Sequence, residues 1–279
     1  MQDPPPGADL VVVGPDELAT DYPGGIGVGS LAPHTRQDLR SLPPAAAGRL
    51  TGLAIERAAQ LALSGEVGAM VTAPAEKQAL HLAGYRYPGH TEFLANLAGG
   101  ADVAMMLAAD TLRVVLVTTH IPLREVAEAI TTERTVLVGE IAQRALREWF
   151  GVADPRLVLC ALNPHGGEDG LFGDEDTAVL APAAERLGAA GPLPADTVFV
   201  RAARGEFDAV LAPYHDVGMT AIKMAAFGRA VNVTLGLPFI RTSPDHGTAF
   251  DIAGKGIADP GSMRRAVELA VQLAQQREA

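Results

Sequence analysis

Short runs of aliphatic residues, each bounded by Gly, Pro or charged residues, recur along the chain. Runs of this length are typical of buried β-strands. The pattern predicts strands at 9–13, 67–72, 103–108, 112–118, 156–162, 209–212 and 231–237. In the last run the aliphatic residues alternate with polar ones, so Asn232 is expected on the face opposite the aliphatics. A further aliphatic segment at 195–200 is separated from 209–212 by a loop.

Between these runs, apolar residues recur every three or four positions, which is the spacing of an amphipathic helix. This spacing predicts helices at 46–64, 75–83, 91–97, 123–130, 131–150, 177–187 and 262–277. Short strands alternating with helices predict an α/β fold with a substantial parallel sheet. The Gly-rich run at 24–29 has no clear strand before it and no helix after it, which argues against a dinucleotide-binding loop.

Composition restricts the class of protein. The 279 residues are 48% hydrophobic and 20% charged, which suits one large globular domain or two ordinary ones. A formal net charge of −11 argues against a general nucleic-acid or anionic-membrane binder. The single cysteine, Cys160, excludes a disulfide within one chain. The sequence has no uninterrupted apolar run long enough to predict a membrane span. Its acidic, Pro-rich start does not resemble a signal peptide, so we expect a cytoplasmic protein.

Three of the seven histidines follow predicted strands directly: His120, His165 and His215. In α/β folds, ligands bind beyond the carboxyl ends of the strands. Each histidine taken singly suits an ordinary loop residue equally well, but all three share one topological position. Three imidazoles leave an open coordination position on a divalent metal, as in a catalytic site. Carboxylates that could orient these imidazoles are Glu168, Asp196 and Asp216.

Positive charge is concentrated between residues 212 and 250 of this otherwise acidic chain. A negative protein that binds an anion must concentrate positive charge locally. Lys223 and Arg241 are suited to hold a phosphate or carboxylate, because Arg binds such groups through two hydrogen bonds and Lys supplies a point charge. His90 and Thr91 begin a predicted helix, where backbone N–H groups favour an anion. An ordinary helix cap with a surface histidine is the alternative there.

Eight segments, in consistent order, are similar to the 4-hydroxythreonine-4-phosphate dehydrogenase family of pyridoxal phosphate biosynthesis, which includes related 4-phosphoerythronate and threonate dehydrogenases. The segments are Thr-Ala-Pro-Ala-Glu-Lys at 72–77, Pro-Gly-His-Thr-Glu-Phe at 88–93, Thr-Thr-His-Ile-Pro-Leu at 118–123, Leu-Asn-Pro-His-Gly-Gly-Glu at 162–168, Pro-Ala-Asp-Thr at 194–197, Tyr-His-Asp-Val-Gly at 214–218, Gly-Arg-Ala-Val-Asn-Val-Thr-Leu-Gly-Leu-Pro-Phe-Ile-Arg-Thr at 228–242 and Asp-His-Gly-Thr-Ala at 245–249. The similarity covers roughly residues 50–270.

The resemblance implies a two-domain fold like that of the isocitrate and isopropylmalate dehydrogenases, with a cleft between the domains. The first α/β domain would comprise residues 1–75 and 225–279. The second, residues 76–224, would carry the metal ligands and the dimer interface. The family forms homodimers whose active sites take residues from both subunits.

The implied reaction is oxidation of 4-(phosphooxy)-L-threonine to the 3-oxo acid, followed by decarboxylation to 3-amino-2-oxopropyl phosphate. The resemblance implies NAD, or NADP, and one divalent metal (Zn, Mg, Mn or Co) as cofactors. The implied metal ligands are His120, His165 and His215, and the implied substrate contacts are His90, Thr91, Lys223, Asn232 and Arg241. Lys223 or Asp216 would accept the proton, and Asp196 is a further catalytic candidate.

Two other interpretations stay open at this point. One is a related dehydrogenase that acts on a 4-phosphorylated erythronate or threonate, or on a cyclic dihydrodiol carboxylate. The other is a metal- and phosphate-binding remnant that has lost its cofactor. Family members begin with a strand and a Gly-Asp/Glu-Pro-Ala-Gly-Ile-Gly-Pro segment that leads into a helix, whereas this chain begins at what resembles the next strand. That difference puts NAD binding in question.

Overall fold

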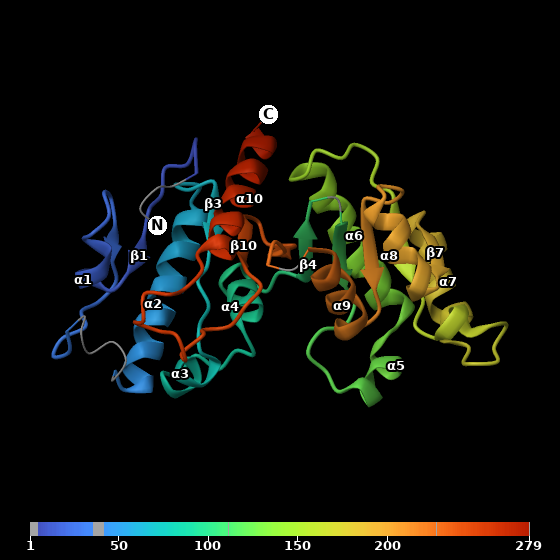
Figure 1. Cartoon of the computed structure of the whole chain (residues 1–279), viewed down its shortest axis with the longest axis horizontal. Helices are drawn as coiled ribbons and strands as arrows, with labels where there is room; N and C mark the ends of the chain where they lie inside the picture. Colours follow the sequence, from blue (N-terminus) through green and yellow to red (C-terminus); the bar gives the residue numbers. More distant parts are fainter. Residues whose placement is uncertain (1–4, 36–41, 111, 227, 279) are drawn as a thin grey trace. The chain divides into compact units, whose positions relative to one another are not determined.

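A computed structural model of the chain describes residues 5–35, 42–110, 112–226 and 228–278. The chain divides into two compact units, one formed by residues 1–102 with 237–272 and the other by residues 103–236 with 273–279 (Figure 1). The expected domain boundaries, after residues 75 and 224, lie earlier in the chain than these two divisions. In both schemes a C-terminal segment returns to the N-terminal part of the chain.

The first unit is built on a long helix beside short parallel strand pairs. Its elements are β1 (Val13–Gly14), α1 (Asp16–Ala19), β2 (Ile26–Gly27), α2 (Pro44–Leu63), β3 (Ala69–Val71), α3 (Lys77–Leu82), α4 (His90–Leu97), β10 (Ile240–Pro244) and the start of α10 (Gly261–Glu278). Strands β1 and β2 pair in parallel, as do β3 and β10. Of the strand expected at 9–13, only its last residue, Val13, belongs to β1, although the carbonyl of Val12 also accepts the N–H of Ile26 at 2.8 Å.

Close helix packing in this unit depends on a glycine. A Cβ on Gly48 of α2 would lie 1.9 Å from the carbonyl oxygen of Ala79 in α3, so no larger residue fits without separating the two helices. Helix α10 is tied to β10 by a hydrogen bond from the Thr242 hydroxyl to the carbonyl of Ala266, at 2.8 Å. These contacts join α2 to α3 and β10 to α10.

The second unit contains a large mixed sheet with the strand order β9-β4-β5-β8-β6-β7. The strands are β4 (Ala104–Ala109), β5 (Leu112–Leu116), β6 (Leu157–Cys160), β7 (Ala190–Leu193), β8 (Ala209–Ala212) and β9 (Val231–Leu235). Strand β4 runs antiparallel to β9 and β5, whereas β5, β8, β6 and β7 are mutually parallel. The predicted α/β class is confirmed, with one antiparallel strand inside the sheet.

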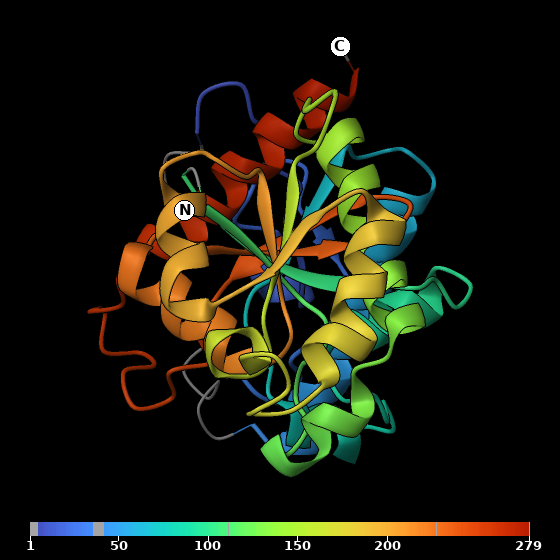
Figure 2. The same ribbon diagram turned by 90° about the vertical axis from the view of Figure 1, so that its right-hand side faces the viewer.

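Helices cover both faces of this sheet. The elements are η2 (Leu123–Glu125), α5 (Val126–Ala129), α6 (Thr132–Glu148), η3 (Pro164–Gly167), η4 (Asp176–Leu180), α7 (Ala181–Leu187), α8 (Ala195–Ala203) and α9 (His215–Ala226). Figure 2 shows α8 and α9 on one side of the strands and α6 and α7 on the other. The aliphatic segment at 195–200 therefore belongs to a helix, α8.

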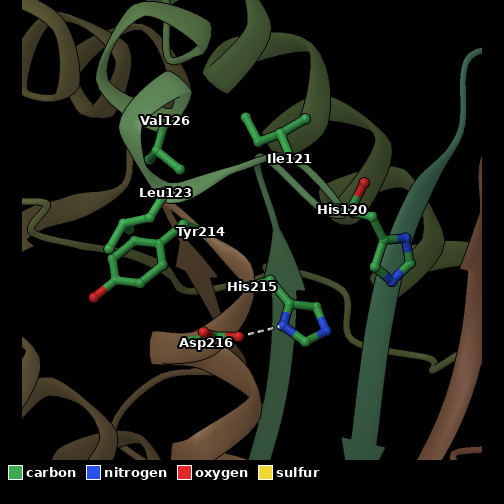
Figure 3. Close-up of a pocket in the computed structure, with 8 residues that line it drawn as sticks. His120, Ile121, Leu123, Val126, Tyr214, His215 and Asp216 are labelled. Atoms are coloured by element: carbon green, nitrogen blue, oxygen red, sulfur yellow. Dashed lines mark hydrogen bonds and ion pairs between the residues drawn. The ribbon is translucent and has the colours of Figure 1, made fainter.

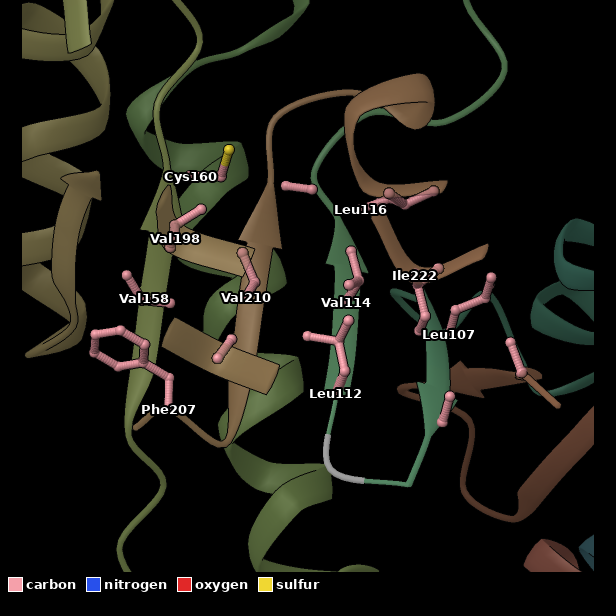
Figure 4. Close-up of a cluster of buried hydrophobic side chains, with 14 of the residues drawn as sticks. Leu107, Leu112, Val114, Leu116, Val158, Cys160, Val198, Phe207, Val210 and Ile222 are labelled. Carbon is pink, nitrogen blue, oxygen red and sulfur yellow. The ribbon is translucent and has the colours of Figure 1, made fainter. Parts of the chain in front are cut away.

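The core between the strands and α8 and α9 positions the first turn of α9. Val114, Leu116, Val210 and Ile222 are all at most 2% exposed in this cluster (Figure 4). A Cβ on Gly218 would lie 2.8–3.0 Å from side chains of Val114, Leu116 and Ala212. Helix α9 thus approaches the sheet as closely as a glycine allows. None of the helices within the described residues is long and apolar enough to cross a membrane.

Candidate active site

Four parallel strands of the second unit end beside one another, and each is followed by a candidate site residue. His120 follows β5, His215 begins the helix after β8, His165 lies in the turn after β6, and Asp196 lies in the first turn of the helix after β7. The four strands are adjacent in the order β5-β8-β6-β7 and point in the same direction. Their carboxyl ends therefore share one edge of the sheet, where ligands bind in such folds.

His120 and His215 form a close pair at this edge. Their ring centroids are 5.4 Å apart and the ring planes are inclined by 47°. Nδ1 of His215 lies 2.6 Å from Oδ1 of Asp216, on the side of the ring away from His120 (Figure 3). When the neutral ring donates its Nδ1–H to this carboxylate, Nε2 carries the lone pair, which is the arrangement of a metal-ligating imidazole with a supporting carboxylate.

The loops that carry the pair are joined by hydrogen bonds beyond the strand ends. The Thr118 hydroxyl, which is 1% exposed, donates to the carbonyl of Pro213 at 2.8 Å. The backbone N–H of Val117 donates to the carbonyl of Ala212 at 2.9 Å. The spacing of the two imidazoles is therefore set by the backbone, as a preorganised site requires.

A small pocket of about 130 Å³ opens beside the pair. Its remaining walls are Thr119, Ile121, Leu123, Val126, Tyr214 and Asp216 (Figure 3). Burial raises the pKa of the Tyr214 phenol, and Cys160 and Asp216 raise it further, so Tyr214 remains a neutral hydrogen-bonding group. The pocket combines two imidazoles with a partly apolar wall.

The rings of His120 and His215 are close enough for both to bind one cation. A cation bound at about 2.0–2.1 Å by one nitrogen of each ring has ring centroids about 5 Å apart when the ligands are tetrahedral. The observed spacing of 5.4 Å fits that geometry. Across the described residues, however, no three His, Cys, Asp or Glu side chains are close enough to hold a metal ion. The structure thus brings His120 and His215 together and does not bring His165 to them.

His165 occupies a tightly fixed, left-handed turn. Its side chain is exposed, and its backbone φ is +54°, a conformation that non-glycine residues adopt at some energetic cost. Gly167 in the same turn has φ +84°, and a Cβ there would lie 2.7 Å from the carbonyl oxygen of Gly173. Residues with such dihedrals persist only where the surroundings determine them, which indicates a functional constraint on this turn.

Asp176 anchors this turn, although no sequence pattern predicts that role. Its carboxylate is fully buried and accepts the backbone N–H groups of Leu162 at 2.7 Å and Asn163 at 3.0 Å. The side chain of Asn163 in turn donates to Glu175 at 2.8 Å. In the sequence, Asp176 is merely the residue before a predicted helix, and nothing there distinguishes it from a helix cap.

The first unit holds a second cluster, around a buried cation. Arg241 in β10 is 3% exposed, and its Nε and Nη2 donate to the hydroxyl of Thr72 at 3.1 and 2.5 Å. Burial lowers the pKa of Arg241 to about 10, so the guanidinium remains charged at neutral pH. Burial and the nearby charge of Arg241 lower the pKa of His90 to about 4, so His90 is neutral.

The helix expected at 91–97 is present as α4 but begins one residue earlier, at His90, with Gly89 and not Thr91 at the N-cap. A helix N-terminus beside a buried guanidinium concentrates positive potential, which favours an anion. Because its imidazole is neutral, His90 can donate a hydrogen bond to such an anion without adding a second buried charge.

The remaining candidates lie in the second unit. Lys223 is half-buried in the last turn of α9. Asn232 lies in β9 opposite Leu107, and its Oδ1 is one of two side-chain atoms in the described residues that are buried without a hydrogen-bond partner. Such an atom costs free energy unless a ligand or water satisfies it. Asp196 and Glu168 are exposed.

Three comparisons relate the chain to known proteins. A model of the family described as "Pyridoxal phosphate biosynthetic protein PdxA" matches residues 32–270. The chain is 52% identical over 228 residues to a 4-hydroxythreonine-4-phosphate dehydrogenase of Pseudomonas aeruginosa, covering 80% of this chain and 70% of the relative. It is 49% identical over 235 residues to a D-threonate 4-phosphate dehydrogenase of Salmonella typhimurium, covering 82% and 72%. A crystal structure of 4-hydroxythreonine-4-phosphate dehydrogenase from Klebsiella pneumoniae matches with a TM-score of 0.80 at 42% identity, covering 95% of this chain and 82% of that one.

Proposed function

The chain belongs to the PdxA family of pyridoxal phosphate biosynthetic proteins and is an oxidoreductase, and from this premise we propose that it oxidises 4-(phosphooxy)-L-threonine. The secondary alcohol is oxidised to a ketone, so the substrate becomes a 3-oxo acid. This acid then loses CO₂ to give 3-amino-2-oxopropyl phosphate. The related substrate D-threonate 4-phosphate is the second candidate, since a relative of nearly equal similarity is named for it. Both substrates are small hydroxy acids with a terminal phosphate.

The observation that carries this proposal is the buried cation cluster of the first unit. Arg241, at 3% exposure, keeps its charge in an environment that disfavours charge, beside the neutral His90. A phosphate offsets the desolvation of such a guanidinium and accepts bidentate hydrogen bonds from it. We assign the phosphate to Arg241, His90 and Thr91, and we assign Asn232 to a polar group of the substrate.

We assign the metal to His120 and His215, with Asp216 orienting the second ring through Nδ1. When bound, a divalent metal supplies a Lewis acid that stabilises negative charge on a substrate oxygen. The third ligand is His165, and we propose that it reaches the metal of the partner subunit in a homodimer. His165 is exposed on a rigid turn and joins no ligand cluster within the described residues of its own chain, which supports this arrangement.

Lys223 is the proposed proton acceptor. Oxidation of the alcohol releases a hydride to the nicotinamide cofactor, NAD or NADP, and a proton to a base. The sequence left Lys223 and Asp216 as equal candidates. Because the Asp216 carboxylate already accepts the Nδ1 proton of His215, it is suited to orient that ring, which leaves the proton to Lys223. Asp196 is exposed at the start of α8 and stays a weaker candidate.

This function is tested by measuring the reduction of NAD or NADP through the absorbance of the reduced nicotinamide. The panel contains 4-(phosphooxy)-L-threonine, D-threonate 4-phosphate, erythronate 4-phosphate and their dephosphorylated forms, each with and without Zn²⁺, Mg²⁺, Mn²⁺ or Co²⁺. We expect turnover of the first substrate with metal, and no turnover of its dephosphorylated form. Absence of turnover with every substrate, together with no thermal stabilisation by NAD, would identify the chain as a remnant without catalysis.

The shared metal site has its own test. His165→Ala and His215→Ala are each expected to be inactive. In a hybrid dimer of the two variants, one site combines the intact His215 of one protomer with the intact His165 of the other. Mixing the variants is therefore expected to restore about one quarter of wild-type activity, since half the dimers are hybrids with one working site. If His165 served its own protomer, mixing would restore nothing.

A further inference from the structure

Thr72 is hydrogen-bonded to one edge of the Arg241 guanidinium. The Thr72 hydroxyl accepts hydrogen bonds from both Nε and Nη2 of Arg241. Thr72 itself is 5% exposed and directly follows β3. Its backbone N–H donates to the carbonyl of Thr242 at 3.1 Å, which continues the parallel pairing of β3 with β10. The hydroxyl is thus held in place by the strand backbone.

This contact determines which part of Arg241 can meet a ligand. Nε and Nη2 lie on one edge of a planar, rigid fork, so a single acceptor that spans them fixes both the plane and the direction of the guanidinium. The end of the fork that carries Nη1 then points away from Thr72. Arginine captures a phosphate with two parallel N–H groups, and that geometry fails when the plane rotates.

We propose that Thr72 is a positioning residue for phosphate recognition, which acts by holding the Arg241 guanidinium in the orientation that binds the substrate's phosphate. The inference rests on the proposed function only in that Arg241 contacts this phosphate. Thr72 selects phosphorylated substrates without touching them, because a guanidinium that is free to rotate meets a phosphate less often in the productive orientation.

Two substitutions at Thr72 and one matched control test the proposal. Thr72→Val keeps the shape of the side chain and removes the acceptor, whereas Thr72→Ser keeps the hydroxyl. Thr242→Val removes a different buried hydrogen bond, from Thr242 to Ala266, on the neighbouring strand. We expect Thr72→Val to raise KM for 4-(phosphooxy)-L-threonine and Kd for inorganic phosphate by about tenfold or more, as for loss of a hydrogen bond to a charged group.

The accompanying readouts separate positioning from mere stability. In Thr72→Val we expect kcat to change far less than KM, and Thr72→Ser to recover most of the phosphate affinity. Thr242→Val should lower the melting temperature and leave KM and the phosphate Kd unchanged. If Thr72→Val is less stable but binds phosphate as wild type does, Thr72 is only structural and the proposal is wrong.

Failure of the proposed function is recognisable separately. If wild type turns over none of the phosphorylated acids but binds inorganic phosphate, calorimetric titration of the Thr72 variants with phosphate still decides the role of Thr72. If wild type binds no phosphate at all, both the assignment of Arg241 and the role of Thr72 are overturned.

Discussion

The imidazoles of His120 and His215 lie with centroids 5.4 Å apart at the ends of two hydrogen-bonded parallel strands. Because Thr118 and Val117 tie the two loops together beyond the strands, the backbone fixes the spacing of the pair. Asp216 adds a carboxylate on the outer side of His215. The same three features would serve a cation that needs neutral nitrogen ligands.

Replacing His215 with Ala is expected to abolish stoichiometric binding of a divalent metal with little loss of thermal stability, because the side chain is one-third exposed and lies outside the core. Elemental analysis after dialysis measures the metal content. His81→Ala is the matched control, since His81 is exposed on α3 and its Nε2 lies 2.8 Å from the carbonyl oxygen of Tyr87. Equal metal content in His215→Ala and His81→Ala would contradict the assignment.

Asp176→Asn is expected to lower the free energy of unfolding by about 1–3 kcal/mol, because an amide has one acceptor oxygen for two backbone N–H donors. The turn that holds His165 should loosen, so the affinity for metal should fall as well. Urea unfolding and metal titration measure the two effects. Asp174→Asn changes an exposed carboxylate two residues away and should alter neither quantity. Loss of stability without loss of metal affinity would limit Asp176 to a structural role.

Gly218→Ala tests the close approach of α9 to the sheet. The new Cβ would lie 2.8–3.0 Å from Val114, Leu116 and Ala212, so the helix must shift, and overpacking of this kind costs about 1–3 kcal/mol. We expect a lower midpoint of urea unfolding and a reduced kcat, since the helix carries both His215 and Lys223. Gly247→Ala, where a Cβ meets nothing within 4 Å, is the control. An unchanged midpoint would show that α9 has room to move.

The sequence predicted that each of the three histidines follows a strand, but it did not predict how the three lie relative to one another. His120, His165 and His215 each follow a strand, as expected, because the three strands before them are local hydrophobic runs. The order β5-β8-β6 and the antiparallel course of β4 depend on pairing between distant segments, which no local pattern encodes. The separation of His165 from the other two therefore became visible only in the structure.

Supporting residues were harder to predict than the residues that they support. Arg241 was identified because a cation in an apolar run of an acidic chain is conspicuous. Thr72 and Asp176 carry no such signal: one is a Thr after a strand and the other an Asp before a helix, and both are common at those places for local reasons. Their roles arise from partners 169 and 13–14 residues away in the chain.

The decrease in the free energy of unfolding at acidic pH should depend on His90. Its pKa is lowered to about 4 by burial and by the charge of Arg241, whereas an unperturbed histidine has a pKa of 6.5. Since the unfolded chain binds the proton more tightly, the contribution of His90 is complete above pH 6.5 and is lost as the pH falls toward 4. The full shift corresponds to about 3 kcal/mol.

His90→Gln removes this titration and keeps a polar side chain of similar length. Urea unfolding at a series of pH values from neutral to about 4.5 should show wild type losing roughly 2–3 kcal/mol more than His90→Gln across that range. His81→Gln, an exposed position on α3, should retain the wild-type slope. Inorganic phosphate should shrink the loss in wild type, because an anion beside Arg241 favours the protonated imidazole. Parallel pH profiles for wild type and His90→Gln would show that Arg241 and burial do not act on His90 as the structure indicates.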